Sequence, residues 1–312
     1  METYPLIAIA GPTGSGKSEL ALRVARQFQG EIVNCDSLQI YRGFNIGTAK
    51  LRPEQREGIP HHLIDILDAG ELFTAGEYAR LGRGVLREIA DRRRVPVIAG
   101  GTGFYLRALL EGLPPGPARS EDLRAQLLGR EGRRPGVLHR LLTRLDPEAG
   151  ARIHPNDLNK TLRALELRLL RNAPAATQEK PEGLSGFRVW KIGLNPPRDA
   201  LYDRLNARLR GMFDEGLEEE VRGLLAAGAS PLAKPFESLG YKEMLLYITG
   251  RLDREKAIEA AQIATRHYAK RQLTWFKRDA EMHWFEGFGG DTTIAERACS
   301  YLGQAISNSN IS

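Results

Sequence analysis

A complete phosphate-loop motif, G-x-x-x-x-G-K-[ST], is formed by Gly11-Pro12-Thr13-Gly14-Ser15-Gly16-Lys17-Ser18. An apolar run at residues 6–10 precedes the motif, and apolar residues recur about every four positions after it, which predicts strand, loop and helix. In such a loop, backbone N–H groups and the helix N-terminus face an oxyanion. Lys17 would meet the terminal phosphate charge, and the Ser18 hydroxyl could ligate Mg²⁺. The motif predicts a phosphorylated ligand.

A second group of polar residues follows a predicted strand at residues 31–34. Asp36 stands just beyond that strand, and functional groups of doubly wound α/β sheets cluster at the carboxyl ends of strands. Asp36 would lie near the phosphate loop if the first two strands are close, although a turn or helix-cap role is also open. Thr102 offers a hydroxyl in a glycine turn after a buried strand at 95–99. Cys35 has no adjoining basic residue and is expected to be small and buried.

Alternating strand and helix patterns predict an α/β protein with a parallel sheet of the P-loop NTPase type. Further strands are expected at 60–66, 187–193 and 283–285, and helices at about 198–215, 217–227, 241–249 and 253–278. Two breaker-rich stretches, 113–120 and 172–186, enclose an Arg-rich helical segment. We therefore expect a core that begins at 1–118, an inserted all-helical domain at 119–186, and completion of the core with C-terminal helices at 187–312.

Three local patterns carry expectations of their own. Adjacent residues of a strand point to opposite faces, so hydrogen-bonding roles are favoured for His61 and His62 over a shared metal ion. The acidic run 218–220 is expected to be a solvated cluster in the first turn of a helix. A core stripe is expected at Leu162, Leu165 and Leu169.

Positive charge is concentrated in two regions of a chain whose formal net charge is +6. Residues 120–175 contain eleven Lys/Arg and seven Asp/Glu. Residues 266–278 contain five Lys/Arg, no acid, and the rings of His267, Tyr268, Trp275 and Phe276. Basic residues interleaved with aromatic ones suit a nucleic-acid surface. The alternative is a solvated helix whose aromatic residues face the core.

The composition, 42% hydrophobic and 27% charged, is typical of a globular protein. No apolar run approaches the ~18 residues of a membrane span, and the first residues lack a signal-peptide pattern. The two cysteines, Cys35 and Cys299, form no C-x-x-C pair, so neither a disulfide framework nor a zinc site is indicated. We expect a cytoplasmic enzyme.

The loop alone leaves two enzymatic functions open. One is a P-loop kinase or NTPase that acts on a small molecule. The other is a transferase that holds a diphosphate leaving group in the loop while it acts on nucleic acid. An NTPase usually needs a strand that ends in a Mg²⁺-binding acid, whereas the strand at 95–99 ends in glycines. A third function, RNA binding without catalysis, would leave the complete phosphate loop unexplained.

Several sequence blocks resemble the bacterial tRNA dimethylallyltransferases. They are GPTGSGKS, DSLQIYRGFNIGTAK, HHLIDI, AGGTGFYLRALLEGL, RIHPND followed by RALE, LYDRLNARLRGMFDEGLEEEV, SLGYKEM and KRQLTWFKRD, in the family's order from Leu6 to about Phe285. Many members have threonine where this chain has Ser18, and this chain lacks the Cys/His zinc extension of eukaryotic relatives. The resemblance implies transfer of a dimethylallyl group from dimethylallyl diphosphate to N6 of the adenine immediately 3′ of the anticodon, in tRNAs that read codons beginning with U, with release of diphosphate.

The resemblance also implies roles for individual residues. Asp36 would accept the proton of the adenine amine, which is a poor nucleophile, and the adenine would be flipped out of its stack. Charge on the leaving diphosphate would be stabilised by the loop 11–18, Ser18 with Mg²⁺, Lys17 and Arg208. Thr102 completes the implied catalytic set. The enzyme is expected to be a monomer. The resemblance implies contacts with the anticodon stem-loop of the tRNA for Asp36, Ser37, Leu38, Gln39, Thr102, Arg124, Asn159, Lys160, Thr161, Leu162, Arg163, Lys270, Arg271, Gln272, Leu273, Thr274, Trp275, Phe276 and Lys277.

Overall fold

The computed structural model describes residues 3–114, 116–117, 119–171 and 181–309. The chain divides into two compact units, of which the first combines the segments up to Leu110 and from Leu184 onward. The second unit is Glu111–Gly183. The boundaries predicted for the inserted domain were 119 and 186, and most of the predicted second linker, at 172–180, lies outside the described residues.

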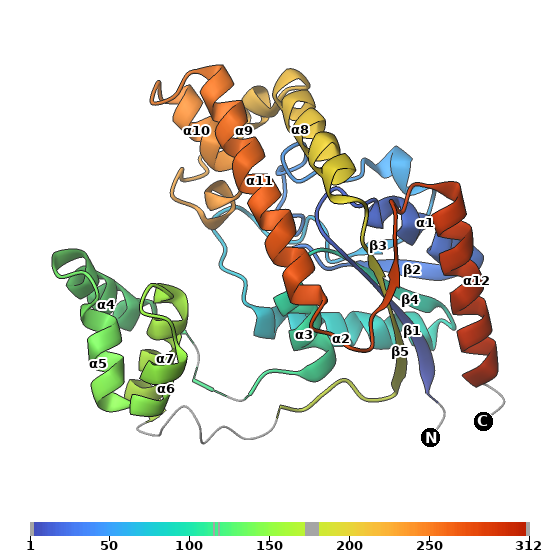
Figure 1. The fold of residues 1–312 in the computed structure, drawn as a ribbon, viewed down its shortest axis with the longest axis horizontal. Helices are drawn as coiled ribbons and strands as arrows, with labels where there is room; N and C mark the ends of the chain where they lie inside the picture. The colour runs from blue at the N-terminus through green and yellow to red at the C-terminus, as the bar shows by residue number, and fades with distance from the viewer. Residues whose placement is uncertain (1–2, 115, 118, 172–180, 310–312) are drawn as a thin grey trace. The chain divides into compact units, whose positions relative to one another are not determined.

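A parallel sheet forms the centre of the first unit (Figure 1). Its strand order across the described residues is β3(His61–His62), β2(Gly30–Asn34), β4(Val95–Ala99), β1(Tyr4–Ala10), β5(Phe187–Leu194) and β6(His283–Phe285). Every neighbouring pair is parallel. These observations confirm the predicted α/β class.

The strand expected at 60–66 is much shorter in the structure. Leu63 and Asp65 both have left-handed backbone angles, φ 57° and 55°, so the chain leaves the sheet directly after β3. The histidines of β3 make separate hydrogen bonds, as predicted. His61 Nδ1 donates to the Ile59 carbonyl at 2.8 Å, and His62 Nε2 donates to the Glu31 carboxylate at 2.7 Å.

The carboxyl ends of the three central strands are level. Ala99 at the end of β4 pairs with Ile9 of β1 on one side and with Asn34 of β2 on the other. β4 therefore separates the first two strands, which the sequence did not predict. Because the strands are parallel, the loops that follow β1, β2 and β4 all leave from one edge of the sheet.

Helices cover both faces of this sheet. The helices α1(Lys17–Gln27) and α12(Thr292–Ser309) pack on the face that presents Ile7 and Ile9, where they form a buried apolar cluster. The opposite face is covered by α2(Ala75–Asp91) and α3(Gly103–Glu111) (Figure 1). A capping box of Thr74 and Glu77 begins α2.

A further helical layer lies beyond the carboxyl edge of the sheet. It contains α8(Arg198–Asp214), α9(Leu217–Ala226), α10(Tyr241–Ile248) and α11(Arg254–Phe276), close to the predicted ranges. Short 3₁₀ turns lie at Pro53–Arg56 and Lys234–Glu237. In Figure 1, α8 and α11 run beside each other above the strand ends. This layer encloses a second apolar cluster, centred on Phe44, Phe236 and Tyr241.

All the secondary-structure elements in the described part of the second unit are helices. Its helices are α4(Glu121–Arg133), α5(Val137–Leu145), α6(Pro147–Arg152) and α7(Leu158–Arg171). They enclose a separate core that includes Leu162 and Leu165. The expected third member of that stripe, Leu169, is 45% exposed, so this part of the prediction is wrong.

Candidate functional site

The phosphate loop joins β1 to α1 at the carboxyl edge of the sheet. Gly16 is the N-cap residue of α1 and has φ 87°, a conformation that glycine adopts without steric cost. Because the N-cap residue is a glycine, it supplies no side-chain cap to the N–H groups of the first turn. An anion in the loop would meet these donors and the positive end of the helix dipole.

Two partly buried cations adjoin the loop. Lys17 Nζ donates to the Pro12 carbonyl at 2.7 Å, and Arg208 Nη2 of α8 donates to the Thr13 hydroxyl at 2.8 Å. Burial lowers the pKa of Lys17 to about 8, while attraction to Asp36 opposes that shift. Burial also lowers the pKa of Arg208, and the neighbouring Arg204 contributes in the same direction. An anionic ligand would stabilise both charges.

Three buried polar atoms near this loop or in the adjoining cavity lack a hydrogen-bond partner among the described residues. They are Ser15 Oγ, Arg208 Nε and Thr265 Oγ1. Native proteins satisfy nearly all buried polar groups, so such orphans call for an explanation. A polar ligand with several acceptor oxygens, such as a diphosphate, would satisfy the Arg208 donor.

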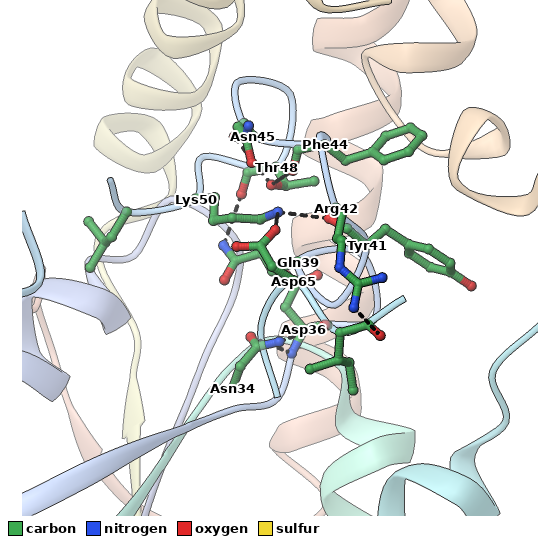
Figure 2. A network of polar contacts seen from close by, with 12 residues as sticks. Asn34, Asp36, Gln39, Tyr41, Arg42, Phe44, Asn45, Thr48, Lys50 and Asp65 are labelled. Carbon is green, nitrogen blue, oxygen red and sulfur yellow. Dashed lines mark hydrogen bonds and ion pairs between the residues drawn. The ribbon is translucent and has the colours of Figure 1, made fainter. Parts of the chain in front are cut away.

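Asp36 lies in a tight turn after β2, which Figure 2 shows from close by. Its Oδ1 accepts from the Leu38 amide at 2.9 Å, and its own amide donates to Asn34 Oδ1 at 3.1 Å. The Thr102 hydroxyl, after β4, accepts from the Ser37 amide at 3.1 Å. Asp36 therefore has the role in a turn that the sequence left open, and Thr102 holds the same turn in place. Cys35 is buried as predicted, and burial raises the pKa of its thiol to about 12.

A cavity of about 530 Å³ brings together three of the four predicted catalytic side chains, whereas the fourth, Lys17, is not among the described residues that line it. Thr13, Asp36, Thr102 and Arg208 all line it. Its other walls are largely apolar or aromatic and include Leu38, Tyr41, Phe73, Phe104, Tyr105, Leu209, Met212, Leu239 and Tyr268. This volume and this mixture are typical of a small-molecule site. Such a cavity could hold an anionic head group and a short hydrocarbon chain together.

The loop 43–50 supplies one wall of this cavity through Gly47 and Thr48. The Glu220 carboxylate accepts from the Asn45 amide at 3.0 Å and the Ile46 amide at 2.8 Å, and Tyr241 donates its hydroxyl to the same carboxylate. The expectation of a wholly solvated acid cluster at 218–220 is therefore wrong for Glu220. Periodicity along one helix cannot reveal a partner 175 residues away.

An ion pair between the buried Lys50 and the partly exposed Asp65 holds the other end of the same loop. Lys50 Nζ donates to Asp65 Oδ1 at 2.6 Å and to the Tyr41 carbonyl at 2.8 Å, as Figure 2 shows. Burial lowers the pKa of Lys50, and the hydrogen bond to Asp65 opposes this shift. Sequence reasoning did not single out Lys50 or Asp65. A lysine in a loop that contains several glycines is expected to be solvated unless its partner is known.

The basic and aromatic part of α11 has an outer and an inner face. Lys270, Arg271, Thr274 and Trp275 line a surface groove of about 460 Å³ with His267 and Arg278. Lys277 is exposed as well, and Leu273 is half-buried. Gln272 and Phe276 are buried, so their side chains belong to the packing of the unit and not to an RNA-facing surface.

Side chains predicted to contact tRNA in the second unit differ in accessibility. Asn159 and Lys160 are exposed, whereas Thr161 and Leu162 are buried. Arg163 donates to the Glu166 carboxylate at 3.3 Å and to the Pro117 carbonyl at 3.1 Å. We therefore assign the side chains of Thr161 and Leu162 to the helix packing.

Arg124 makes a buried ion pair within the same unit. Its guanidinium donates to both oxygens of the fully buried Glu166 carboxylate at 2.8 Å. Burial opposes ionisation of Glu166, but hydrogen bonds from Arg124 and the Ser120 amide outweigh it and lower the pKa of the carboxyl group. The geometry gives Arg124 a structural role instead of a free phosphate-binding one.

The residues present fit a Mg²⁺ ion that arrives with a diphosphate. Among the described residues, no group of three His, Cys, Asp or Glu side chains could hold a metal ion by itself. Ser18 in the first turn of α1 offers a hydroxyl beside the loop. Mg²⁺ commonly takes few protein ligands and completes its shell with substrate phosphates and water.

No helix within the described part of the chain is both long and apolar enough to cross a membrane.

Comparison with known proteins gives consistent matches. The family model described as IPP transferase matches residues 39–279. A tRNA dimethylallyltransferase of Solibacter usitatus is 56% identical over 306 residues, which cover 96% of this chain and 100% of that protein. A tRNA dimethylallyltransferase of Koribacter versatilis is 51% identical and covers 95% of this chain and 97% of its own.

Solved structures show the same similarity. The full-length tRNA isopentenylpyrophosphate transferase of Bacillus halodurans superimposes with a TM-score of 0.73 at 36% identity, covering 97% of both chains. A eukaryotic dimethylallyltransferase acting on tRNA gives a TM-score of 0.83 at 27% identity, covering 98% of this chain and 80% of that one.

Proposed function

The chain belongs to the IPP transferase family, and from this premise we propose that it is a tRNA dimethylallyltransferase. It transfers the dimethylallyl group of dimethylallyl diphosphate to N6 of the adenine immediately 3′ of the anticodon, in tRNAs that read codons beginning with U. Diphosphate is the second product. The enzyme acts in the cytoplasm as a monomer.

The observation that carries this proposal is the composition of the 530 Å³ cavity. It combines the phosphate-loop residue Thr13, the cation Arg208 and the carboxylate Asp36 with walls such as Leu209 and Met212. A diphosphate needs the cations, a dimethylallyl chain needs the apolar walls, and an amine nucleophile needs a proton acceptor. One cavity provides for all three requirements.

In the proposed reaction, the adenine N6 lone pair forms a bond to C1 of the allyl group while the C1–O bond breaks. The bonding electrons of that C1–O bond leave with the diphosphate, and Asp36 accepts the proton that N6 loses. Lys17, Arg208 and the amides of the loop stabilise the charge that grows on the leaving group. A Mg²⁺ ion bound by the diphosphate oxygens and the Ser18 hydroxyl would add positive charge there.

The outer face of α11 is the part of the first unit best suited to RNA. Lys270, Arg271 and Lys277 provide positive charge, and Trp275, which is 39% exposed, provides a ring for stacking. We propose that Asn159 and Lys160 of the second unit contact the same RNA. The target adenine would have to be flipped out of its stack to enter the cavity.

Mass spectrometry of nucleosides from tRNA tests this function directly. Purified protein is incubated with unmodified tRNA, dimethylallyl diphosphate and Mg²⁺. We expect the adenosine 3′ of the anticodon to gain the mass of one dimethylallyl group, with ATP neither required nor hydrolysed. Stoichiometric phosphate release from ATP without allyl transfer would instead establish the small-molecule kinase or NTPase function.

A further inference from the structure

Gln272 of α11 joins the two loops that flank the diphosphate site. Its Oε1 accepts from the Thr13 amide of the phosphate loop at 2.7 Å, and its Nε2 donates to the Gly101 carbonyl after β4 at 2.7 Å. One partner can only donate and the other can only accept, so they fix the orientation of this side-chain amide. The residue is only 6% exposed, so water competes little for either bond.

The loop after β4 is shaped to admit α11 at close range. A Cβ atom on Gly101 would lie 2.2 Å from Gln272 Nε2, and one on Gly103 would lie 2.3 Å from the Trp275 ring. A side chain at Gly101 would therefore displace the Gln272 amide, and one at Gly103 would displace the Trp275 ring. Thr102 stands between these two glycines and holds the turn that carries Asp36 through the Ser37 amide. Contacts of α11 thus reach both the diphosphate loop and the loop beside the general base.

The same short stretch of α11 presents its other face to solvent. Lys270, Arg271 and Trp275 line the surface groove, within three residues of Gln272 along the helix. An RNA bound there would favour one placement of the helix through its charge and ring contacts. Because a helix is rigid over one turn, that placement also determines where the Gln272 amide lies.

We propose that Gln272 is a positioning residue that couples RNA binding on the outer face of α11 to diphosphate binding in the phosphate loop. RNA on the groove favours the α11 position in which Gln272 holds Thr13 and Gly101 together. The diphosphate binds the loop in the same arrangement, so each ligand strengthens the binding of the other. This inference rests on the proposed function, since it takes RNA as the occupant of the groove.

The chain offers a matched control for this role. Gln262 lies on the same helix and donates to the Asn206 carbonyl of α8 at 3.0 Å, away from both loops. Gln262→Leu and Gln272→Leu each remove an amide that ties α11 to another element. Only Gln272→Leu removes a tie to the diphosphate site.

The test is calorimetric titration of inorganic diphosphate with Mg²⁺ into the full chain, alone and with a saturating anticodon stem-loop RNA. In the wild type and in Gln262→Leu, RNA should tighten diphosphate binding by at least about fivefold, the lower range of allosteric couplings. In Gln272→Leu the factor should fall below about two. A general loss of stability would lower the melting temperature of both variants without this selective loss of coupling.

Gln272→Glu serves as a second variant and covers the case in which Gln272→Leu does not fold. It keeps the side-chain length and an acceptor for the Thr13 amide but places an oxygen against the Gly101 carbonyl, so the coupling should again be lost. An unchanged factor in the folded Gln272 variants, or no coupling in a wild type that transfers the dimethylallyl group, would overturn the inference. A wild type that transfers no dimethylallyl group to tRNA would instead count against the proposed function.

Discussion

Arg208 Nη2 donates a hydrogen bond to the Thr13 hydroxyl at 2.8 Å, across 195 residues of sequence. This bond joins α8, in the helical layer beyond the carboxyl edge of the sheet, to the phosphate loop. The loop thereby receives a second cation besides Lys17. The Nε atom of the same guanidinium has no partner within the described part of the chain. Arg208 is therefore held in place with a donor still available to a ligand.

We predict that Arg208→Ala lowers kcat for dimethylallyl transfer by about 10²–10³-fold, as expected when a donor to a developing anion is removed. The control is Arg204→Ala, which removes an arginine one helical turn earlier that pairs with the half-exposed Glu19 at 3.0 Å. That variant should stay within about threefold of the wild type. Steady-state kinetics of both variants make the comparison, and equal losses would show that Arg208 has no special role.

Diphosphate affinity should fall as the pH rises above about 8, because the partly buried Lys17 of the free enzyme loses its proton there. A bound diphosphate favours the ammonium form and raises the pKa of Lys17, so above that pH binding takes up a proton. Affinity then decreases by up to about tenfold per pH unit. Titration calorimetry from pH 7.5 to 10 measures this slope. Lys17→Arg stays charged throughout the range, so its slope should be flat, and equal slopes would contradict the assignment.

Asp36→Asn separates the two roles of this side chain. The amide oxygen can still accept from the Leu38 amide, as Oδ1 does at 2.9 Å in the wild type, so the turn and diphosphate binding should survive. An amide is a very poor proton acceptor, and the single-turnover rate should therefore fall by ~10²–10⁴-fold. Rapid-quench measurements on tRNA test this. A rate near that of the wild type would leave Asp36 as a turn residue alone.

Local sequence patterns predicted those parts of the site that depend on neighbours in sequence. The loop between β1 and α1 and the position of Asp36 after β2 follow from strand and glycine patterns. Nothing in the helical spacing of Arg208 distinguishes it from a surface residue, so its role was implied only by the family resemblance. Arg204 does form the surface ion pair that such spacing suggests.

Three of the features that were missed depend on partners in other segments of the chain. The placement of β4 between β1 and β2, the Lys50–Asp65 pair and the bonds of Glu220 to the loop 43–50 each join separate segments. Hydrophobic periodicity reports which face of an element is buried, but it does not report what that face meets. For the same reason, the inward direction of Gln272 within a basic helix could not be predicted.

Glu220→Ala should loosen the cavity wall formed by Gly47 and Thr48. It leaves the Asn45 and Ile46 amides without their carboxylate acceptor, which should lower the free energy of unfolding by about 1–3 kcal/mol and raise KM for dimethylallyl diphosphate. Urea unfolding and steady-state kinetics measure the two effects. Glu219→Ala, at the exposed neighbouring position, should change stability by no more than about 0.5 kcal/mol. Equal behaviour of the two variants would contradict the anchoring role of Glu220.

Lys270→Ala should weaken tRNA binding and make that binding less dependent on the salt concentration. Lys270 is exposed on the groove of α11, and loss of one phosphate contact reduces the slope of log affinity against log salt by about one. Affinity for dimethylallyl diphosphate should hardly change, because Lys17 and Arg208 hold its charge. Filter binding or fluorescence anisotropy over a range of salt concentrations gives the slope.

Two further variants make the salt experiment decisive. Lys242→Ala removes an exposed lysine on α10, so it lowers the net charge equally and should leave the slope unchanged. Arg163→Ala should act differently from both, since the Arg163 guanidinium already binds Glu166 and the Pro117 carbonyl. We expect it to destabilise the second unit more than it alters the slope. If Lys270→Ala and Lys242→Ala give the same slope as the wild type, the α11 groove is a solvated face and the RNA binds elsewhere.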